Sequence, residues 1–263
     1  MSSRPTISVD SPPGGWLDPW PNVAEIEAAF AHQNWTLVGG LMTQLHAIHN
    51  GVASLRPTND VDVVLHIETR RGRPTQAAKV LKRLGYELTP SLDDKNETAH
   101  RYRRAKSKAG VHSIVATPFD IVDVLIADHS APRQVEKLEG RKMVAIEGGT
   151  QALNRTINAE LEINPGRITT LSVPSAFGAA LLKAVAYRAD SRDPGRHLTD
   201  AAVLLACIED PRADRKSFTG SDRSRVLILA RQLPASSPYW KPLSETHRQQ
   251  GQAALAILSQ GLN

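Results

Sequence analysis

The order of helical and extended patterns between residues 23 and 67 constrains the fold of this chain more than any other feature. Residues 23–32 have the apolar spacing of a helix, and the short apolar run 35–38 ends at a pair of glycines. Residues 41–49 return to helical spacing, and residues 61–67 are β-branched and apolar at alternate positions, as in a strand. This order of helix, strand, glycine turn, helix and strand predicts an α/β unit.

Similar patterns continue to the end of the chain, first mixed and then mainly helical. The expected helices cover residues 74–84, 150–158, 176–189, 198–208, 224–233 and 245–258. The expected strands cover residues 100–105, 119–127, 143–146 and 168–173. Ser172 and Ser175, on either side of Pro174, are of the type that marks the start of a helix. The predicted fold class is α/β (α+β), with a mixed sheet followed by helices.

Composition divides the chain into three predicted parts. Residues 1–21 are rich in Pro, Gly and Ser, which predicts an irregular N-terminal arm. Residues 22–173 form the predicted core, and residues 174–263 form a mainly helical C-terminal domain. Within that domain, the polar stretch 209–223 predicts a mobile linker.

The bulk properties are those of a globular protein. With 263 residues and 41% hydrophobic content, the chain can bury at least one core. The sequence has no run of about eighteen apolar residues and no secretory signal at its start. Cys207 is the single cysteine, which excludes an internal disulfide and a zinc site with several cysteines. We therefore expect a soluble, cytoplasmic protein with no membrane partner.

The chain carries a net charge of +5 and has a pI near 9.5. Its positive residues gather in two clusters, which consist of Arg70, Arg71 and Arg73, and of Arg101, Arg103, Arg104, Lys106 and Lys108. Such clusters suit a phosphate-rich partner such as RNA. They are equally compatible with two solvated loops.

Candidate chemistry concentrates at Asp60 and Asp62, at the entrance of the predicted strand 61–67. Residues two apart on a strand project to the same side, so both carboxylates can reach one point. Their mutual repulsion becomes favourable when a divalent cation lies between them, and Mg²⁺ prefers carboxylate, water and phosphate oxygens. The pair therefore predicts a Mg²⁺ (or Mn²⁺) site for phosphoryl or nucleotidyl transfer. The same spacing also occurs in calcium loops, helix caps and exposed strands.

The glycine pair Gly39-Gly40 lies between a predicted strand and a predicted helix, about twenty residues before the acidic pair. Backbone N–H groups of such a turn can bind phosphate, although an ordinary strand-to-helix turn has the same appearance. His46 and His49 are three residues apart on the following helix, but no third ligand lies nearby in the sequence, so we do not predict a metal site there.

Together these motifs resemble the signature of a known family. Val38-Gly39-Gly40 followed by Arg56-x-Thr58-x-Asp60-x-Asp62 is similar to the signature of AbiEii/MenT-type nucleotidyltransferases, which have the polymerase-β-like fold. The later part of the family layout is matched by Val122-Asp123-Val124-Leu125, by Lys183 and Arg188, and by Arg196-His197-Leu198 with Asp200. The resemblance spans about residues 36–206.

The resemblance implies an activity, partners and residue roles. It implies Mg²⁺-dependent transfer of a nucleoside monophosphate from NTP to an acceptor hydroxyl, which for some members lies on tRNA at the 3' end. Members include toxins of toxin–antitoxin systems, so a cognate antitoxin is an implied partner. The implied metal ligands are Asp60, Asp62 and Asp123. The implied nucleotide-binding residues are Gly39, Gly40, Arg56, Thr58, Lys183, Arg188 and Asp200, with Lys183 also neutralising the triphosphate. For Lys183, a lysine whose stem crosses an apolar helix face to reach solvent is the alternative.

The third acid is a choice between Asp120 and Asp123. These two residues are an odd number apart and face opposite sides of a regular strand. Asp123 lies inside an apolar run, where an unpaired charge is costly and a metal would stabilise it. Asp120 is expected at the start of the strand, in solvent. We therefore favour Asp123 as the third metal ligand.

The sequence departs from the family pattern in two places. Leu41 follows the glycines where the family often has Ser or Thr, and Arg196-His197 stand where a Lys-Asp pair is common. Two alternatives therefore stay open: a catalytically silent nucleotide- or RNA-binding protein of the same fold, and a nucleotidyltransferase that modifies a small molecule such as an aminoglycoside. The basic cluster from Arg101 to Lys108 favours RNA as the acceptor.

Overall fold

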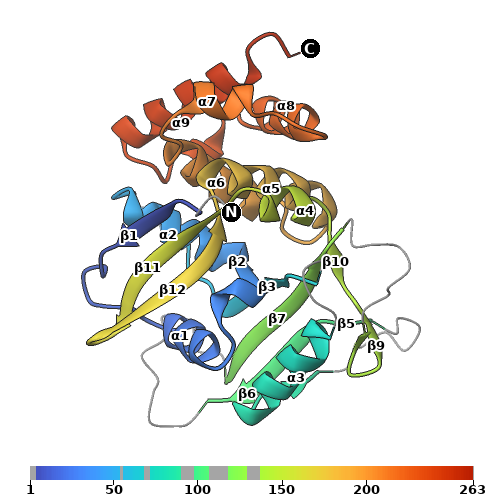
Figure 1. Cartoon of the computed structure of the whole chain (residues 1–263). Coiled ribbons are helices and arrows are strands. Elements are labelled where there is room, and N and C mark those ends of the chain that lie inside the picture. Colours follow the sequence, from blue (N-terminus) through green and yellow to red (C-terminus); the bar gives the residue numbers. More distant parts are fainter. Residues whose placement is uncertain are drawn as a thin grey trace. The chain divides into compact units, whose positions relative to one another are not determined.

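The computed structural model of the chain describes residues 4–53, 56–67, 72–89, 98–106, 118–128 and 137–262 (Figure 1). The chain forms two compact units, each built from two segments. The first unit consists of Met1–Leu41 and Pro57–Val173, and the second of Met42–Arg56 and Pro174–Asn263. The mixed α/β class predicted from the sequence is confirmed. The predicted division into residues 1–21, 22–173 and 174–263 stays a prediction.

A mixed sheet forms the centre of the first unit. Its strands, in spatial order, are β2 (Trp35–Val38), β3 (Asp60–Leu65), β7 (Phe119–Ala127), β6 (Arg101–Ala105) and β4 (Glu87–Leu88), and β10 (Ala145–Ile146) also pairs with β7. Strands β3 and β7 run parallel, whereas β2 is antiparallel to β3 and β6 is antiparallel to β7. The predicted bounds of β2 and β7 are confirmed.

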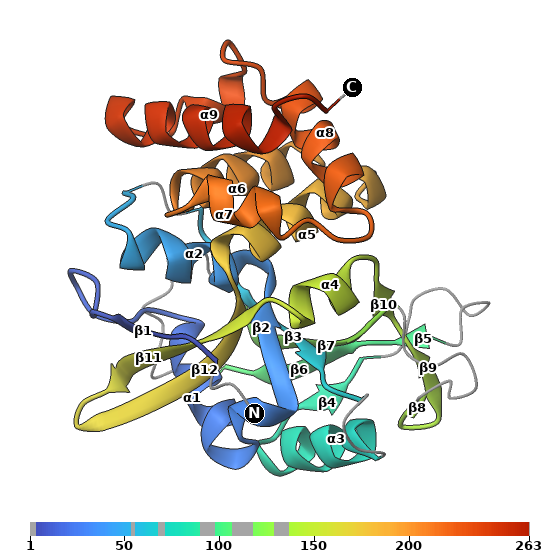
Figure 2. The ribbon, with the colours of Figure 1, turned by 45° about the horizontal axis from the view of Figure 1, so that its top comes forward.

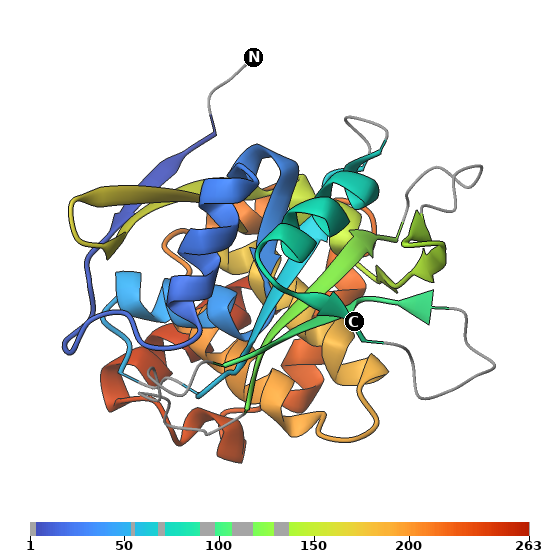
Figure 3. The same cartoon turned by 90° about the horizontal axis from the view of Figure 1, so that it is seen from below.

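One face of this sheet is apolar because alternate residues of its strands are hydrophobic. Val63 of β3 and Val122 of β7 lie on this face, together with side chains of helices α1 (Trp20–Ala29) and α3 (Arg73–Arg83). Figure 3 shows both helices on this side of the sheet. Since side chains alternate along a strand, the neighbouring positions of β3 and β7 point to the opposite face. That opposite face carries Asp60, Asp62 and Asp123.

A second sheet corrects two predictions. Its strands are β1 (Thr6–Val9), β11 (Thr156–Asn164) and β12 (Arg167–Pro174), with β1 parallel to β11. The segment expected to be an irregular arm therefore contains a strand. The helix expected over residues 150–158 is confirmed only at its start, because α4 (Gly149–Leu153) ends early and β11 begins at Thr156. In β11, burial alternates through Ala159, Leu161 and Ile163, which is the period of a strand.

A small third sheet and a short 3₁₀ helix complete the first unit. The sheet contains β5 (Thr98–Ala99), β9 (Arg141–Met143) and β8 (Lys137–Leu138), and the 3₁₀ helix is η1 (His32–Asn34). Helix α2 (Gly39–His49) begins in the first segment of the first unit, which ends at Leu41, and its remaining residues belong to the second unit.

Helices make up most of the second unit (Figure 2). They are α5 (Ala176–Ala189), α6 (Gly195–Ala206), α7 (Pro211–Lys216), α8 (Asp222–Gln232), α9 (Glu245–Ser259) and the 3₁₀ helix η2 (Pro238–Trp240). The Ser175 hydroxyl accepts a hydrogen bond from the Gly178 backbone N–H, which confirms the predicted cap of α5. The linker expected over residues 209–223 is wrong, since Asp210 caps α7 through the backbone N–H groups of Arg212 and Ala213.

Among the described residues, every helix is too short or too polar to cross a membrane.

Candidate active site

Strand register brings three acidic residues together on the polar face of the mixed sheet. Asp62 of β3 lies directly beside Asp123 of β7, and Asp60 is two residues earlier on the same face of β3. One carboxylate oxygen from each of the three lies within 4.8 Å of the others. The arrangement offers only oxygen ligands, which suits Mg²⁺ or Mn²⁺.

The Thr58 hydroxyl orients the first of these carboxylates. It donates a 2.7 Å hydrogen bond to Oδ1 of Asp60, and Thr58 is itself buried. A carboxylate oxygen that accepts one hydrogen bond keeps further lone pairs available. Thr58 can therefore hold Asp60 in place while Asp60 binds a cation.

The glycine pair lies directly against this acidic strand. A Cβ atom at Gly39 would lie 1.8 Å from Oδ2 of Asp62, and one at Gly40 would lie 2.7 Å from Oγ1 of Thr58. Gly39 also has φ of +70°, which disfavours other residue types. The glycine turn and the Thr58-x-Asp60-x-Asp62 strand therefore form one packed structure. Phosphate binding by the turn stays a prediction.

Arg101 was not predicted as part of the site, yet it contacts the third acid. It lies opposite Asp123 in the antiparallel β6–β7 pair. Its Nε donates to Oδ1 at 2.8 Å, and its Nη2 donates to Oδ2 at 2.6 Å. Spacing along the chain could not reveal this contact, because it depends on how β6 pairs with β7.

The rest of the basic cluster is partly neutralised by acids. Arg104 binds Asp120 at 3.1 Å and also pairs with Glu25, and Lys106 donates to Asp18 at 2.9 Å. The expectation that Asp120 lies in solvent is wrong: it is 9% exposed, because Arg104 covers it. These pairs reduce the charge that the cluster offers to an RNA. Arg70, Arg71 and Lys108 lie outside the described residues.

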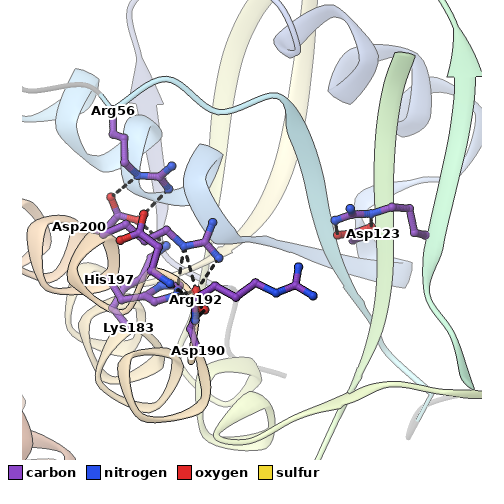
Figure 4. A network of polar contacts seen from close by, with 10 residues as sticks. Arg56, Asp123, Lys183, Asp190, Arg192, His197 and Asp200 are labelled. Atoms are coloured by element: carbon purple, nitrogen blue, oxygen red, sulfur yellow. Dashed lines mark hydrogen bonds and ion pairs between the residues drawn. The ribbon is translucent and has the colours of Figure 1, made fainter. Parts of the chain in front are cut away.

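In the second unit, a buried cluster joins three of the predicted nucleotide-binding residues (Figure 4). Lys183 Nζ donates to Oδ2 of Asp200 at 2.7 Å, and Arg56 Nε donates to Oδ1 at 3.2 Å. Lys183 and Asp200 are 4% and 2% exposed. Burial alone would raise the pKa of Asp200, but the charges of Lys183 and Arg56 lower it below its usual value. Lys183 is thus held by a carboxylate.

Arg196 and His197, which depart from the family pattern, both contact Asp190. Its Oδ2 accepts from Nη2 of Arg196 at 2.8 Å and interacts with Nε2 of His197 at 3.0 Å. Its Oδ1 accepts from the backbone N–H groups of Arg192 and Asp193, which lower the pKa of Asp190. Asp190 therefore fixes the loop before α6 (Figure 4).

The last of the predicted nucleotide-binding residues is Arg188. It lies exposed in the last turn of α5.

No protein-family model matches the sequence, and no curated protein does either. Among solved structures, the chain is similar to the crystal structure of an antigenic nucleotidyltransferase-like protein from Paracoccidioides brasiliensis, with a TM-score of 0.51 and 16% sequence identity. The similarity covers 86% of this chain and 93% of that chain. At this identity the comparison shows the fold alone. The chain shares the fold of that nucleotidyltransferase-like protein, whereas its relation to the AbiEii/MenT type stays a prediction.

Proposed function

We propose that this protein transfers a nucleoside monophosphate from a nucleoside triphosphate to an acceptor hydroxyl, with Mg²⁺ or Mn²⁺ held by Asp60, Asp62 and Asp123. The observation that carries the proposal is the meeting of these three carboxylates within 4.8 Å on one face of a mixed sheet. The nucleotidyltransferase-like fold gives this cluster its chemical context.

The three residues fit a divalent cation on chemical grounds. Three carboxylates at this distance repel one another, and a cation between them removes the repulsion. When bound, the ion would neutralise charge on the triphosphate and lower the pKa of the acceptor hydroxyl. Thr58 would keep Asp60 oriented toward the ion.

The protein's own residues would provide the rest of the catalysis. Asp123 would accept the proton of the acceptor hydroxyl as that oxygen attacks the α-phosphorus and pyrophosphate leaves. The rate would depend mainly on positioning and electrostatic stabilisation. We also propose, from the family resemblance, that Lys183 neutralises the triphosphate. The other nucleotide-binding residues would be Gly39, Gly40, Arg56, Thr58, Arg188 and Asp200.

As the acceptor we propose RNA, in particular the 3' end of tRNA. From the same resemblance we propose that the protein is a toxin with a cognate antitoxin. The net charge of +5 and the exposed Arg103 support a polyanionic acceptor. The pairing of Arg104 and Lys106 with acids weakens the contribution of the basic cluster. The family resemblance is therefore the stronger support.

The test is incubation of purified protein with total tRNA, Mg²⁺ and each α-labelled NTP in turn. An Asp60→Ala/Asp62→Ala double variant should lose labelling, whereas the exposed control Glu209→Gln should retain it. Label on tRNA only with active protein supports the full proposal. Label only on an added aminoglycoside would replace RNA by a small acceptor. Nucleotide binding without any labelled product would overturn the enzymatic function in favour of a silent binding protein.

A further inference from the structure

The third carboxylate of the cluster already has a cationic partner in the fold. Both oxygens of Asp123 accept hydrogen bonds from Arg101, in the two-pronged geometry that makes arginine–carboxylate pairs strong. Asp123 is nearly buried, with 8% of its side chain exposed, whereas 35% of the Arg101 side chain is exposed. The arginine is therefore the partner with room to move.

The other two acids of the cluster, Asp60 and Asp62, also attract the Arg101 guanidinium electrostatically. Its pKa is raised, first by the hydrogen bond to Asp123 and further by the charges of Asp123, Asp60 and Asp62. The guanidinium thus acts as a resident cation at a site whose ligand set suits divalent metal. A metal ion bound by all three carboxylates would lie close to this guanidinium, and like charges repel.

The two remaining acids lie on the neighbouring strand β3. Asp60 accepts a hydrogen bond from the neutral hydroxyl of Thr58. Asp62 lies against Gly39 at the start of α2. One oxygen of each lies within 4.8 Å of an Asp123 oxygen, so an ion bound by Asp60 and Asp62 would lie next to the Arg101–Asp123 pair.

We propose that Arg101 competes with divalent metal for Asp123, so that the free protein binds one ion through Asp60 and Asp62 and excludes a second. This inference rests on the metal site of the proposed function and adds a residue that sets its ion stoichiometry. Arg101 is a positioning residue here, since it acts on the metal through Asp123.

The test is a titration of the full chain with Mn²⁺, in which electron paramagnetic resonance measures the concentration of free Mn²⁺. Arg101→Gln is expected to bind a second Mn²⁺ at least about tenfold more tightly than the wild type does. Arg103→Gln is the matched control. It removes the same charge from the same strand, two residues away and opposite Ile121 instead of Asp123, and it should not create the second site.

Further variants separate the explanations. The gain in Arg101→Gln should disappear in Arg101→Gln/Asp123→Asn, because the second site needs the released carboxylate. Arg101→Lys keeps the charge but not the paired hydrogen bonds, so it should show a smaller gain in the same direction and also serves if Arg101→Gln fails to fold.

Three results would overturn the inference. Two tight sites in the wild type would do so, as would Arg101→Gln binding Mn²⁺ no better than the wild type while Asp60 and Asp62 remain necessary. Weaker binding in Arg101→Gln would show instead that Arg101 holds Asp123 in place for the ion. If neither protein binds Mn²⁺, the metal site of the proposed function fails as well, which distinguishes the two failures.

Discussion

The Asp62 carboxylate occupies the space that a side chain at Gly39 would need. A Cβ atom there would lie 1.8 Å from Oδ2 of Asp62, far closer than two non-bonded atoms approach. The glycine and the acid are more than twenty residues apart in the sequence, and the antiparallel β2–β3 pair places them side by side. The geometry of the acidic cluster therefore depends on a residue with no side chain of its own.

We expect Gly39→Ala to impair metal binding as well as stability. The φ of +70° alone should cost about 1 kcal/mol, and displacement of Asp62 should add roughly 1–3 kcal/mol. Gly166→Ala is the matched control, because Gly166 has φ of +75° but nothing within 4 Å of its Cβ position. Urea unfolding and Mn²⁺ titration of both variants check this. Equal metal affinity in the two variants would contradict the role of Gly39.

We expect Asp120 and Asp123 to differ in what their loss affects. Asp123→Asn should reduce the labelling rate by at least about 100-fold, because a metal ligand and proton acceptor is lost. Asp120→Asn should keep activity but lose about 1–3 kcal/mol of stability, since Arg104 loses a charged partner. Initial rates and urea midpoints of both variants separate the roles. An inactive but fully stable Asp120→Asn protein would reverse the assignment.

The buried pair Lys183–Asp200 predicts an asymmetry between its two partners. Asp200→Asn should destabilise the protein by about 3–5 kcal/mol, because Lys183 would stay buried without its counter-charge. Lys183→Met should cost less, because Arg56 still pairs with Asp200 at 3.2 Å. Thermal or urea unfolding measures both. Equal losses of stability would show that Arg56 does not compensate.

His46 predicts a loss of stability in acid. Burial lowers its pKa from 6.5 to about 4, and its Nε2 lies 2.8 Å from the Pro174 carbonyl oxygen. Between these two pH values, His46 binds a proton in the unfolded chain but stays neutral in the folded chain. Stability should therefore fall as the pH drops from 6.5 toward 4, with a loss of about 3 kcal/mol from this residue.

His46→Gln tests that dependence. Glutamine can still donate to the Pro174 carbonyl, so this variant should lose less stability between pH 7 and pH 4.5 than the wild type. His49→Gln, on the same helix, is the control and should follow the wild type. Urea unfolding at the two pH values provides the measurement, and identical curves for His46→Gln and the wild type would contradict the prediction.

Local sequence patterns were sufficient for elements whose signal lies within one segment. The strand at Trp35–Val38 and the helix at Ala176–Ala189 have the predicted bounds, because apolar runs, glycines and a serine cap mark their ends. The strand Thr156–Asn164 was predicted in part as a helix, because its alternation is interrupted at its start and its partner β1 is about 150 residues away. Helix α7 was missed although Asp210-Pro211 is a recognisable start signal.

The sequence by itself determined the mixed α/β class and the side of strand β3 to which Asp60 and Asp62 point, because alternation along a strand is a local property. Only the tertiary structure decided that Asp123 lies beside Asp62, that Arg101 binds Asp123, and that Gly39 leaves room for Asp62. These contacts depend on strand order and register. Register results from the packing of residues distant in sequence, so no single segment of the chain contains it.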